Sequence, residues 1–187
     1  MRTASKSFSC WEFCHWITSC MRSRNLEPVL NTTTNFNDKI KPAMVTLGPS
    51  GNSSGANESM PARPDTQIIK IIIRHVDVIC AIRILYRCNG KDEWTKWWGD
   101  KKDTQLLSEI NLDEDEYLTS IYGSFNAFDN FYEVIRSLTF VSNKKTYGPY
   151  GSEVGVSFKY DAQQGRIVGF FGHVNKYLLA IGVYIVA

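Results

Sequence analysis

Short hydrophobic runs, most of them rich in β-branched residues, recur along the chain from about Met44 onward. Isoleucine is the commonest residue of segments 67–75 and 79–87, and branching at Cβ favours strands over helices. Between residues 154 and 160, apolar and polar positions alternate strictly. The apolar positions of that run are Val154, Val156, Phe158 and Tyr160. A period of two is typical of a strand with one buried face, so all three segments are predicted as strands.

Four further segments are strand candidates: residues 117–122, 133–141, 166–171 and 178–186. Turn-forming pairs separate the runs, and these are Asn89-Gly90, Gly148-Pro149 and Gln164-Gly165. No segment shows helical periodicity over a useful length. Many short strands at close spacing, without helices to cover a parallel sheet, predict an all-β antiparallel barrel, sandwich or prism over residues 44–187.

Residues 1–43 have a different composition, rich in Ser, Thr, Asn and Cys, with neither helical periodicity nor alternation. We interpret them as an irregular N-terminal extension of low order. Four side chains in this segment are potential zinc ligands, namely Cys10, Cys14, His15 and Cys20. Their spacing matches none of the common paired-ligand patterns, so no metal site is predicted.

Length and charge limit the function classes that remain. The 187 residues fit one domain with an additional segment. A formal net charge of +2 is too small to indicate nucleic-acid binding, which phosphate neutralisation dominates. No run approaches the roughly 18–20 consecutive apolar residues of a transmembrane helix, and the N terminus lacks the apolar centre of a secretory signal. These features, with five cysteines at low density, predict a soluble cytoplasmic protein without a membrane or nucleic-acid partner.

The sequence offers little catalytic chemistry. None of the three histidines has a second ligand at a recognised spacing, and nucleophile-elbow, phosphate-loop and dinucleotide fingerprints are absent. We therefore predict no catalytic residue, no metal and no cofactor. The acidic run Asp113–Glu116 would supply the paired carboxylates of a glycoside hydrolase only if they converged in a pocket, and a solvated turn is the preferred interpretation.

Five ordered motifs carry a resemblance to a known family. They are Tyr117–Gly123, Val134–Phe140, Asn143–Gly151, Gly165–Gly172 and Ala180–Tyr184. This arrangement resembles the jacalin-related lectins of plants, over roughly Leu47 to Ala187, and is most similar to their mannose-binding, cytoplasmic branch. The resemblance implies a β-prism of three four-stranded antiparallel sheets, an absence of catalysis and metal, a sugar site formed by loops at one end, and assembly into homo-oligomers.

The resemblance also implies the residues of a site for mannose-type glycans. In the family, an early glycine and a late Gly-x-x-x-Asp loop hold the sugar hydroxyls. Here Gly55 stands at the position of the early glycine, and the late loop begins with Asn175 instead of Gly. Lys176 and Tyr177 follow, with backbone N–H groups available as donors. Leu179 stands where the family has its carboxylate, so the charged hydrogen-bond acceptor is missing and weakened sugar affinity is expected.

Each of these residues also has a plain structural interpretation: Gly55 as a turn glycine, Tyr177 and Leu179 as packed core. A second sugar site found in some family members would need Asp at the position of Cys80, and its partner loop, 97–103, has lost its glycines. That second site is predicted to be inactive. Trp94, Trp97 and Trp98 are interpreted as strand-edge packing rather than sugar stacking. Two functions stay open, a mannose-class lectin and a sugar-silent prism that acts as a protein-interaction or assembly module.

Overall fold

The computed structural model describes residues 42–187, and every regular element within that range is a β-strand. The strands are β1 (Met44–Gly51), β2 (Ala56–Ser59), β3 (Gln67–His75), β4 (Ile79–Cys88), β5 (Lys91–Trp94), β6 (Trp98–Gly99), β7 (Leu106–Asn111), β8 (Leu118–Phe128), β9 (Phe131–Ser142), β10 (Thr146–Gly151), β11 (Val156–Asp161), β12 (Arg166–Val174) and β13 (Leu178–Val186). No helix long and apolar enough to cross a membrane occurs among these residues.

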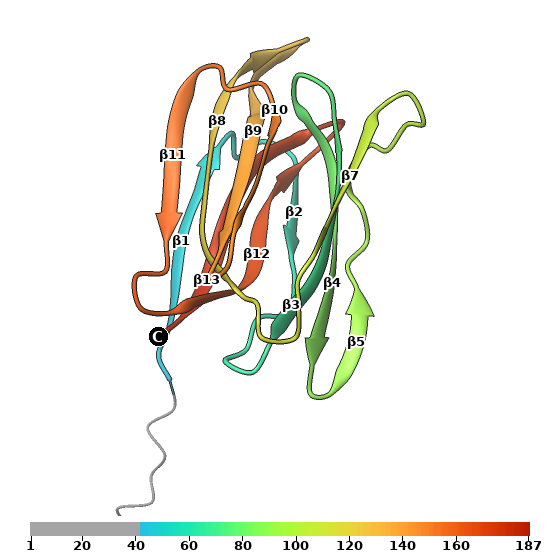
Figure 1. Ribbon diagram of the computed structural model, residues 1–187. Helices are drawn as coiled ribbons and strands as arrows, with labels where there is room; N and C mark the ends of the chain where they lie inside the picture. Colours follow the sequence, from blue (N-terminus) through green and yellow to red (C-terminus); the bar gives the residue numbers. More distant parts are fainter. Residues whose placement is uncertain (1–41) are drawn as a thin grey trace, which may run out of the picture. The chain divides into compact units, whose positions relative to one another are not determined.

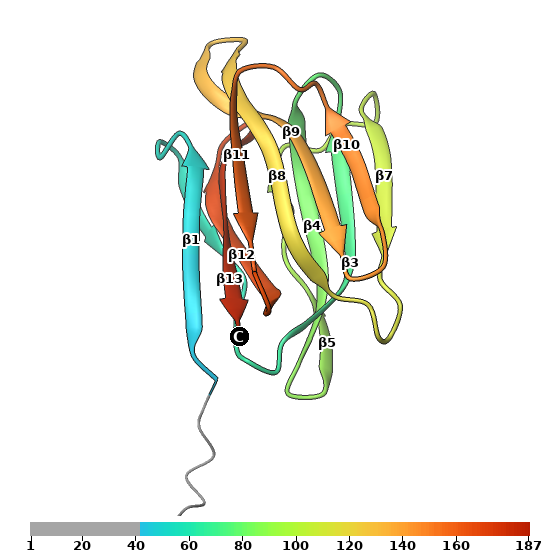
Figure 2. The same cartoon turned by 60° about the vertical axis from the view of Figure 1, so that its left-hand side comes forward.

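The strands form three antiparallel sheets arranged around one core (Figures 1 and 2). Their orders are β1-β13-β12-β2, β10-β9-β8-β11 and β5-β4-β3-β7, with β6 also paired to β4. In the last sheet β5 and β6 therefore share the position that one outer strand occupies in the others. The prediction of an all-β prism of three sheets is confirmed, with this single interruption of the four-stranded pattern.

Each sheet is built on a central hairpin whose two strands are buried between outer strands. The hairpins are β3–β4, β8–β9 and β12–β13. In the sheet of β1, the first strand pairs with the last, from Met44 opposite Val186 to Gly51 opposite Ala180. The two ends of the described chain are thus tied together within one sheet.

The core fills the space between the three sheets. It is built from inward side chains of all the central hairpins, among them Ile71, Phe140 and Phe170, together with Trp98 of β6, each 0–1% exposed. Burying a side chain of this size stabilises the fold by about 1.5–3 kcal/mol. The strands β3 and β4 therefore each have a buried face, as their hydrophobic pattern predicts.

The Gly148-Pro149 pair was predicted as a turn, and this is wrong. Both residues lie inside β10, where the pairing with β9 shifts register between Tyr147 and Tyr150. Because proline has no N–H for the ladder, an outer strand with a bulge is the position in a sheet that tolerates it. Asn89-Gly90 does form the β4–β5 turn, with both residues at positive φ.

The prediction of an irregular extension over residues 1–43, with its potential zinc ligands, falls outside the described residues apart from its last two positions. It stays a prediction.

Candidate functional site

Three hairpin turns lie together at one end of the prism, the upper end in Figure 1, which we call the tip. Hydrogen bonds tie the turns to neighbouring sheets and loops. Arg136 Nε, on β9, donates to the carbonyl of Asp77 in the β3–β4 turn at 3.0 Å. The Asp100 N–H, in the loop after β6, donates to the carbonyl of Lys176 in the β12–β13 turn at 3.2 Å. The tip is therefore one connected surface to which all three sheets contribute.

The three sheets repeat one geometric feature at the tip. In each, an outer strand ends with a glycine at positive φ, directly opposite the second strand of the central hairpin. A Cβ on that glycine would clash with a main-chain carbonyl oxygen of the opposite strand. The glycine and carbonyl partners are Gly51 with Leu179, Gly99 with Cys80, and Gly151 with Arg136. Leu179, Cys80 and Arg136 thus occupy equivalent positions, and none of them is a carboxylate.

The predicted residues Gly55 and Leu179 lie in contact. Gly55 has φ of +122°, and a Cβ on it would stand 3.1 Å from Leu179 Cδ1 and 2.6 Å from the Val174 carbonyl oxygen. The early loop therefore packs directly on the late hairpin. Gly55 is required both by its backbone conformation and by this close approach.

Leu179 itself is fully buried. It belongs to a small hydrophobic cluster at the tip, separate from the main core, which we call the tip cluster. The members of the tip cluster are Val78, Cys80, Val134, Tyr177 and Leu179, with Phe128 and Phe131 packed against them. Leu179 therefore holds the hairpins together at the position where the family resemblance places a sugar-binding carboxylate.

The remaining predicted residues form the β12–β13 turn. The Asn175 N–H donates to the Tyr177 carbonyl at 3.0 Å and closes the turn. The Tyr177 ring is 8% exposed and stands edge-on to Phe128 and Phe131, with ring centroids 5.5 and 5.6 Å away. Tyr177 is thus largely a packed residue that presents its hydroxyl end, while the Lys176 side chain extends over its ring at 5.1 Å.

Sequence reasoning missed Asp129, which supplies a carboxylate at the tip. It occupies the β8–β9 turn at φ of +54°. Its Oδ2 accepts hydrogen bonds from Lys176 Nζ at 2.6 Å and from the Tyr177 hydroxyl at 3.4 Å. The hydrogen bond from Lys176, assisted by its charge, holds the pKa of Asp129 below the ordinary value. An Asp-Asn pair between two phenylalanines is a turn signal that would have predicted this hairpin.

A cavity of about 220 Å³ opens at the tip beside the turn. Its lining combines side chains of all three hairpins with the β6–β7 loop: Val76, Cys80, Asp100, Lys102, Thr104, Gln105, Phe128, Lys176 and Tyr177. Lys176 and Tyr177 are the two predicted site residues that line it, whereas Gly55, Asn175 and Leu179 do not. Burial raises the pKa of the Cys80 thiol, although the ammonium groups of Lys102 and Lys176 act in the opposite direction. Cys80 is thus a buried thiol at the position of the predicted inactive second site.

The acidic run has a structural role. Asp113 and Asp115 pair with Lys144 at 3.2 and 2.5 Å, whereas Glu116 is 1% exposed. Burial alone would raise the pKa of Glu116, but hydrogen bonds from the Ser142 and Tyr147 hydroxyls, at 2.5 and 2.7 Å, leave it lowered. The interpretation of a wholly solvated turn is therefore wrong for Glu116, which anchors the turn to the sheet. No two carboxylates of this run converge on a pocket.

Trp94 and Trp98 are both engaged in packing contacts. Trp98 is 1% exposed and part of the core, and Trp94 is stacked by the Arg83 guanidinium at 4.9 Å. The packing of Trp94, on the edge strand β5, agrees with the interpretation as strand-edge packing, whereas Trp98 is a core residue.

Comparison with known proteins gives consistent matches. The model of the jacalin-like lectin domain matches residues 47–184. Jacalin-related lectin 3 from Arabidopsis thaliana is 36% identical over 154 residues, covering 81% of this chain and 25% of that protein. Jacalin-related lectin 19 from the same plant is 36% identical over 143 residues, covering 75% of this chain and 80% of that protein. The chain thus spans a quarter of the length of the first relative and most of the second.

Among solved structures, a mannose-binding jacalin-related lectin from Ananas comosus aligns with a TM-score of 0.71 at 34% sequence identity. The alignment covers 76% of this chain and 96% of that one.

Proposed function

The chain belongs to the jacalin-like lectin family, whose members bind carbohydrates and are not enzymes, and we propose that it binds sugars of the mannose and glucose class at its tip. The contact between Gly55 and Leu179 carries this proposal. It joins the early glycine loop to the late hairpin, which is the loop pairing that a sugar site of this family needs.

Recognition of the hydroxyls then relies on a different acceptor from the one that the family resemblance implies. A sugar presents neighbouring hydroxyls that both donate and accept hydrogen bonds. The main-chain N–H groups of Lys176 and Tyr177 are the donors. Asp129 is the carboxylate acceptor at this end, and it reaches the turn from a neighbouring hairpin instead of from position 179. Because Asp129 is already engaged by Lys176, its hydrogen bonds to a sugar compete with an existing ion pair.

Weak affinity for a single sugar follows from these contacts. Monosaccharide binding at about 1 mM corresponds to roughly −4 kcal/mol. A hydrogen bond to a charged group contributes about 1.5–3 kcal/mol, so loss of one such bond weakens binding about tenfold to more than a hundredfold. Multivalent attachment to a branched glycan recovers avidity by about 10²–10⁴ where several sites engage together. The natural ligand in this proposal is therefore a branched mannose-type glycan.

The test is calorimetric titration of the purified full chain with methyl α-mannoside and with mannotriose. Two variants restore an acceptor at position 179: Leu179→Asp, which is charged, and Leu179→Asn, which is neutral. Leu106→Asp is the matched control, because Leu106 is 62% exposed and begins β7, next to the β6–β7 loop of the tip. Thermal melts establish that each variant is folded.

Saturable binding of mannotriose by the wild type, strengthened in Leu179→Asn, supports the proposal. A wild type without any binding overturns it, whether or not the variants gain affinity. Sugar binding by the variants but not by the wild type would identify a site that has lost its function through Leu179.

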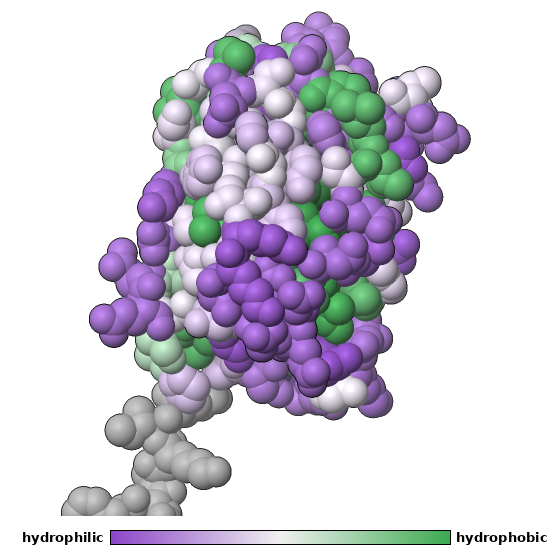
Figure 3. Space-filling model, in the orientation of Figure 1, coloured by the Kyte–Doolittle hydropathy of each residue, from purple (hydrophilic) through white to green (hydrophobic). Residues whose placement is uncertain are grey.

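A second candidate function is a sugar-silent prism that serves as an interaction module. The observation that favours it is the exposed apolar surface around the β3–β4 turn and the start of β7, visible in Figure 3. Val76, Leu106 and Leu107 are 43%, 62% and 51% exposed there. Exposed apolar patches mark interaction surfaces in many proteins. Failure of all sugar titrations would favour this candidate.

Two further expectations belong to the same proposal. We propose homo-oligomers, because β1 is the edge strand of its sheet among residues 42–187 and exposes Met44 and Val45 by 43% and 50%. Light scattering after size-exclusion chromatography tests this. We also propose a cytoplasmic location, which imaging of a fluorescent fusion tests.

A further inference from the structure

A groove on the outer face of the β10-β9-β8-β11 sheet has the chemistry of a second ligand site. Its volume is about 400 Å³, within the usual range of small-molecule sites. The lining residues are Tyr122, Gly123, Ser124, Ser137, Glu153, Ser157, Phe158 and Lys159. None of them lines the tip cavity.

Three serines form a row across the floor of the groove. Ser157 is directly opposite Ser124 on the neighbouring strand, and Ser124 is directly opposite Ser137 on the next. Directly paired residues share one face of a sheet, so the three hydroxyls line up across three strands. Ser124 and Ser137 are buried residues, 4% and 2% exposed, and their hydroxyls share a hydrogen bond at 2.9 Å. One hydrogen bond leaves this pair with one donor and three acceptor sites for a ligand.

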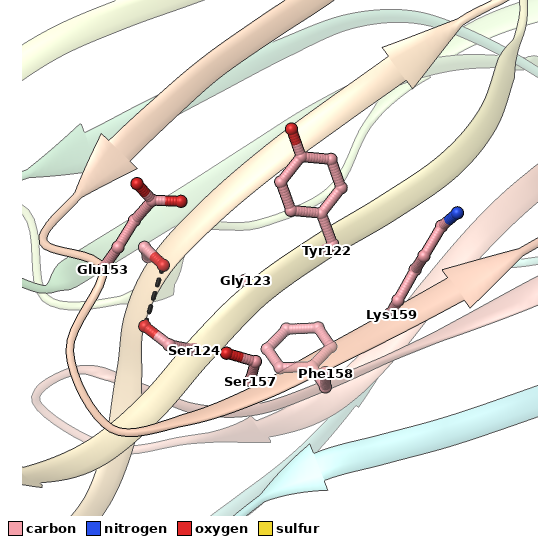
Figure 4. A pocket seen from close by; sticks show the side chains of 8 residues that line it. Tyr122, Gly123, Ser124, Glu153, Ser157, Phe158 and Lys159 are labelled. Carbon is pink, nitrogen blue, oxygen red and sulfur yellow. Dashed lines mark hydrogen bonds between the residues drawn. The ribbon is translucent and has the colours of Figure 1, made fainter.

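Charged and aromatic groups surround this row, as Figure 4 shows. Glu153, from the β10–β11 loop, stands at one end and Lys159 at the other, with Tyr122 between them. Lys159 is directly opposite Tyr122 in the pairing of β11 with β8. At Gly123 the strands approach closely, since a Cβ on this residue would clash with the Ser137 carbonyl oxygen. The lining of the groove therefore contains an aromatic ring, a row of hydroxyl groups and a carboxylate.

The charges favour a neutral ligand over an anion. Lys159 is already paired with Asp161 at 3.0 Å. Glu153 makes no ion pair or side-chain hydrogen bond with any other residue between 42 and 187, so its carboxylate is available. The three groups together carry a net negative charge at neutral pH, which opposes the binding of phosphate or a carboxylate.

We propose that this groove is a saccharide-binding site separate from the tip. A carboxylate accepts hydrogen bonds from two neighbouring sugar hydroxyls, the serine hydroxyls donate and accept with others, and the Tyr122 ring covers an apolar face of the pyranose. The inference rests on the proposed function in one respect, that the chain binds carbohydrates. The two proposed sites lie at different places on the protein. The groove has a carboxylate, that of Glu153, whereas the tip has leucine at position 179.

The experiment is a chemical-shift titration of the ¹⁵N-labelled full chain. The probes are methyl α-mannoside, methyl β-galactoside and mannotriose, added separately. Amide signals of Ser124, Ser137 and Ser157 report on the groove, and those of Asp129 and Lys176 report on the tip.

Two variants address the groove. Glu153→Gln removes the charge of the carboxylate, and Ser157→Gln fills the groove from its exposed edge. Glu114→Gln is the matched control, an exposed glutamate in the turn before β8. The spectrum of each variant without sugar establishes that it is folded.

Saturable shifts at the groove amides, weakened about tenfold by Glu153→Gln and abolished by Ser157→Gln but unchanged by Glu114→Gln, support the proposal. Shifts of the tip amides without shifts of the groove amides would contradict the groove as a binding site, while the proposed function at the tip would stand. Shifts at the groove alone support the groove and overturn the tip. Absence of shifts at both overturns both.

Discussion

Leu179 packs against Gly55, with its Cδ1 only 3.1 Å from the position that a Cβ would take on the glycine. One side chain thus fills the space between the early loop and the late hairpin. The same leucine is buried in the tip cluster, which joins residues of three hairpins. A residue at position 179 can pack the hairpins of the tip together or bind a ligand. Leucine does the first.

Leu179→Asp is expected to lower the free energy of unfolding by about 3 kcal/mol or more. The change removes a buried aliphatic side chain and places a carboxylate among apolar neighbours. Urea denaturation at pH 7 measures the loss. The control Leu106→Asp, at a position that is 62% exposed, is expected to change stability by no more than about 0.5 kcal/mol. Equal effects of the two substitutions would contradict the burial argument.

Gly51→Ala is expected to destabilise the fold by more than Gly90→Ala. Both glycines have positive φ, +108° and +73°. A Cβ on Gly51 would clash with the Leu179 carbonyl, whereas nothing lies within 4 Å of a Cβ on Gly90. Gly90→Ala is therefore expected to lower the free energy of unfolding by about 1 kcal/mol, the penalty for a non-glycine residue at positive φ. Gly51→Ala carries this penalty and the steric clash as well. Denaturant midpoints measure the difference, and similar midpoints would refute the close approach at the tip.

The central strands could be predicted from the sequence because burial on the core face dictates their composition. The predicted bounds of β3 and β13 match the structure residue for residue. The outer strands β1, β2, β5, β6, β7 and β10 were not predicted as strands. A strand such as β5, Lys91–Trp94, is exposed at every position, so no hydrophobic pattern marks it.

The candidate site was predictable where it is local in sequence and, for Gly55, where the family resemblance marks the position. Asn175–Leu179 are consecutive residues of the β12–β13 turn and the start of β13, and the family resemblance identifies their positions. Asp129 meets Lys176 across 47 positions of sequence, and no pattern in either segment indicates the other. Such pairs depend on how the sheets meet, which sequence spacing does not encode.

Glu116→Gln is expected to destabilise the protein at pH 7 by about 1–2 kcal/mol, because charge-assisted hydrogen bonds from Ser142 and Tyr147 are weakened. The pKa of Glu116 is lowered in the folded state, so its contribution to stability is present above the ordinary glutamate pKa and is lost as pH falls through the folded value. Urea denaturation between pH 7 and pH 3 should therefore show the difference between wild type and variant shrinking with acid. A difference that stays constant over this range would contradict the assignment.

Asp129→Asn is expected to weaken mannotriose binding about tenfold, because the proposed site then loses the charged acceptor that contacts Lys176 and Tyr177. Asp65→Asn, at an exposed carboxylate in the loop between β2 and β3, is the control and should leave the affinity unchanged.

The pH dependence of binding gives an independent measurement on the same residue. The hydrogen bond from Lys176 lowers the pKa of Asp129, so the carboxylate stays ionised below the ordinary aspartate pKa, which is about 3.9. Calorimetric affinity of the wild type should therefore be flat from pH 7 to about pH 4 and fall only in stronger acid. The Asn variant should be weak and independent of pH throughout. A wild-type affinity that already declines between pH 6 and pH 5 would exclude Asp129 as the acceptor, because a carboxylate held by an ammonium group cannot gain a proton there.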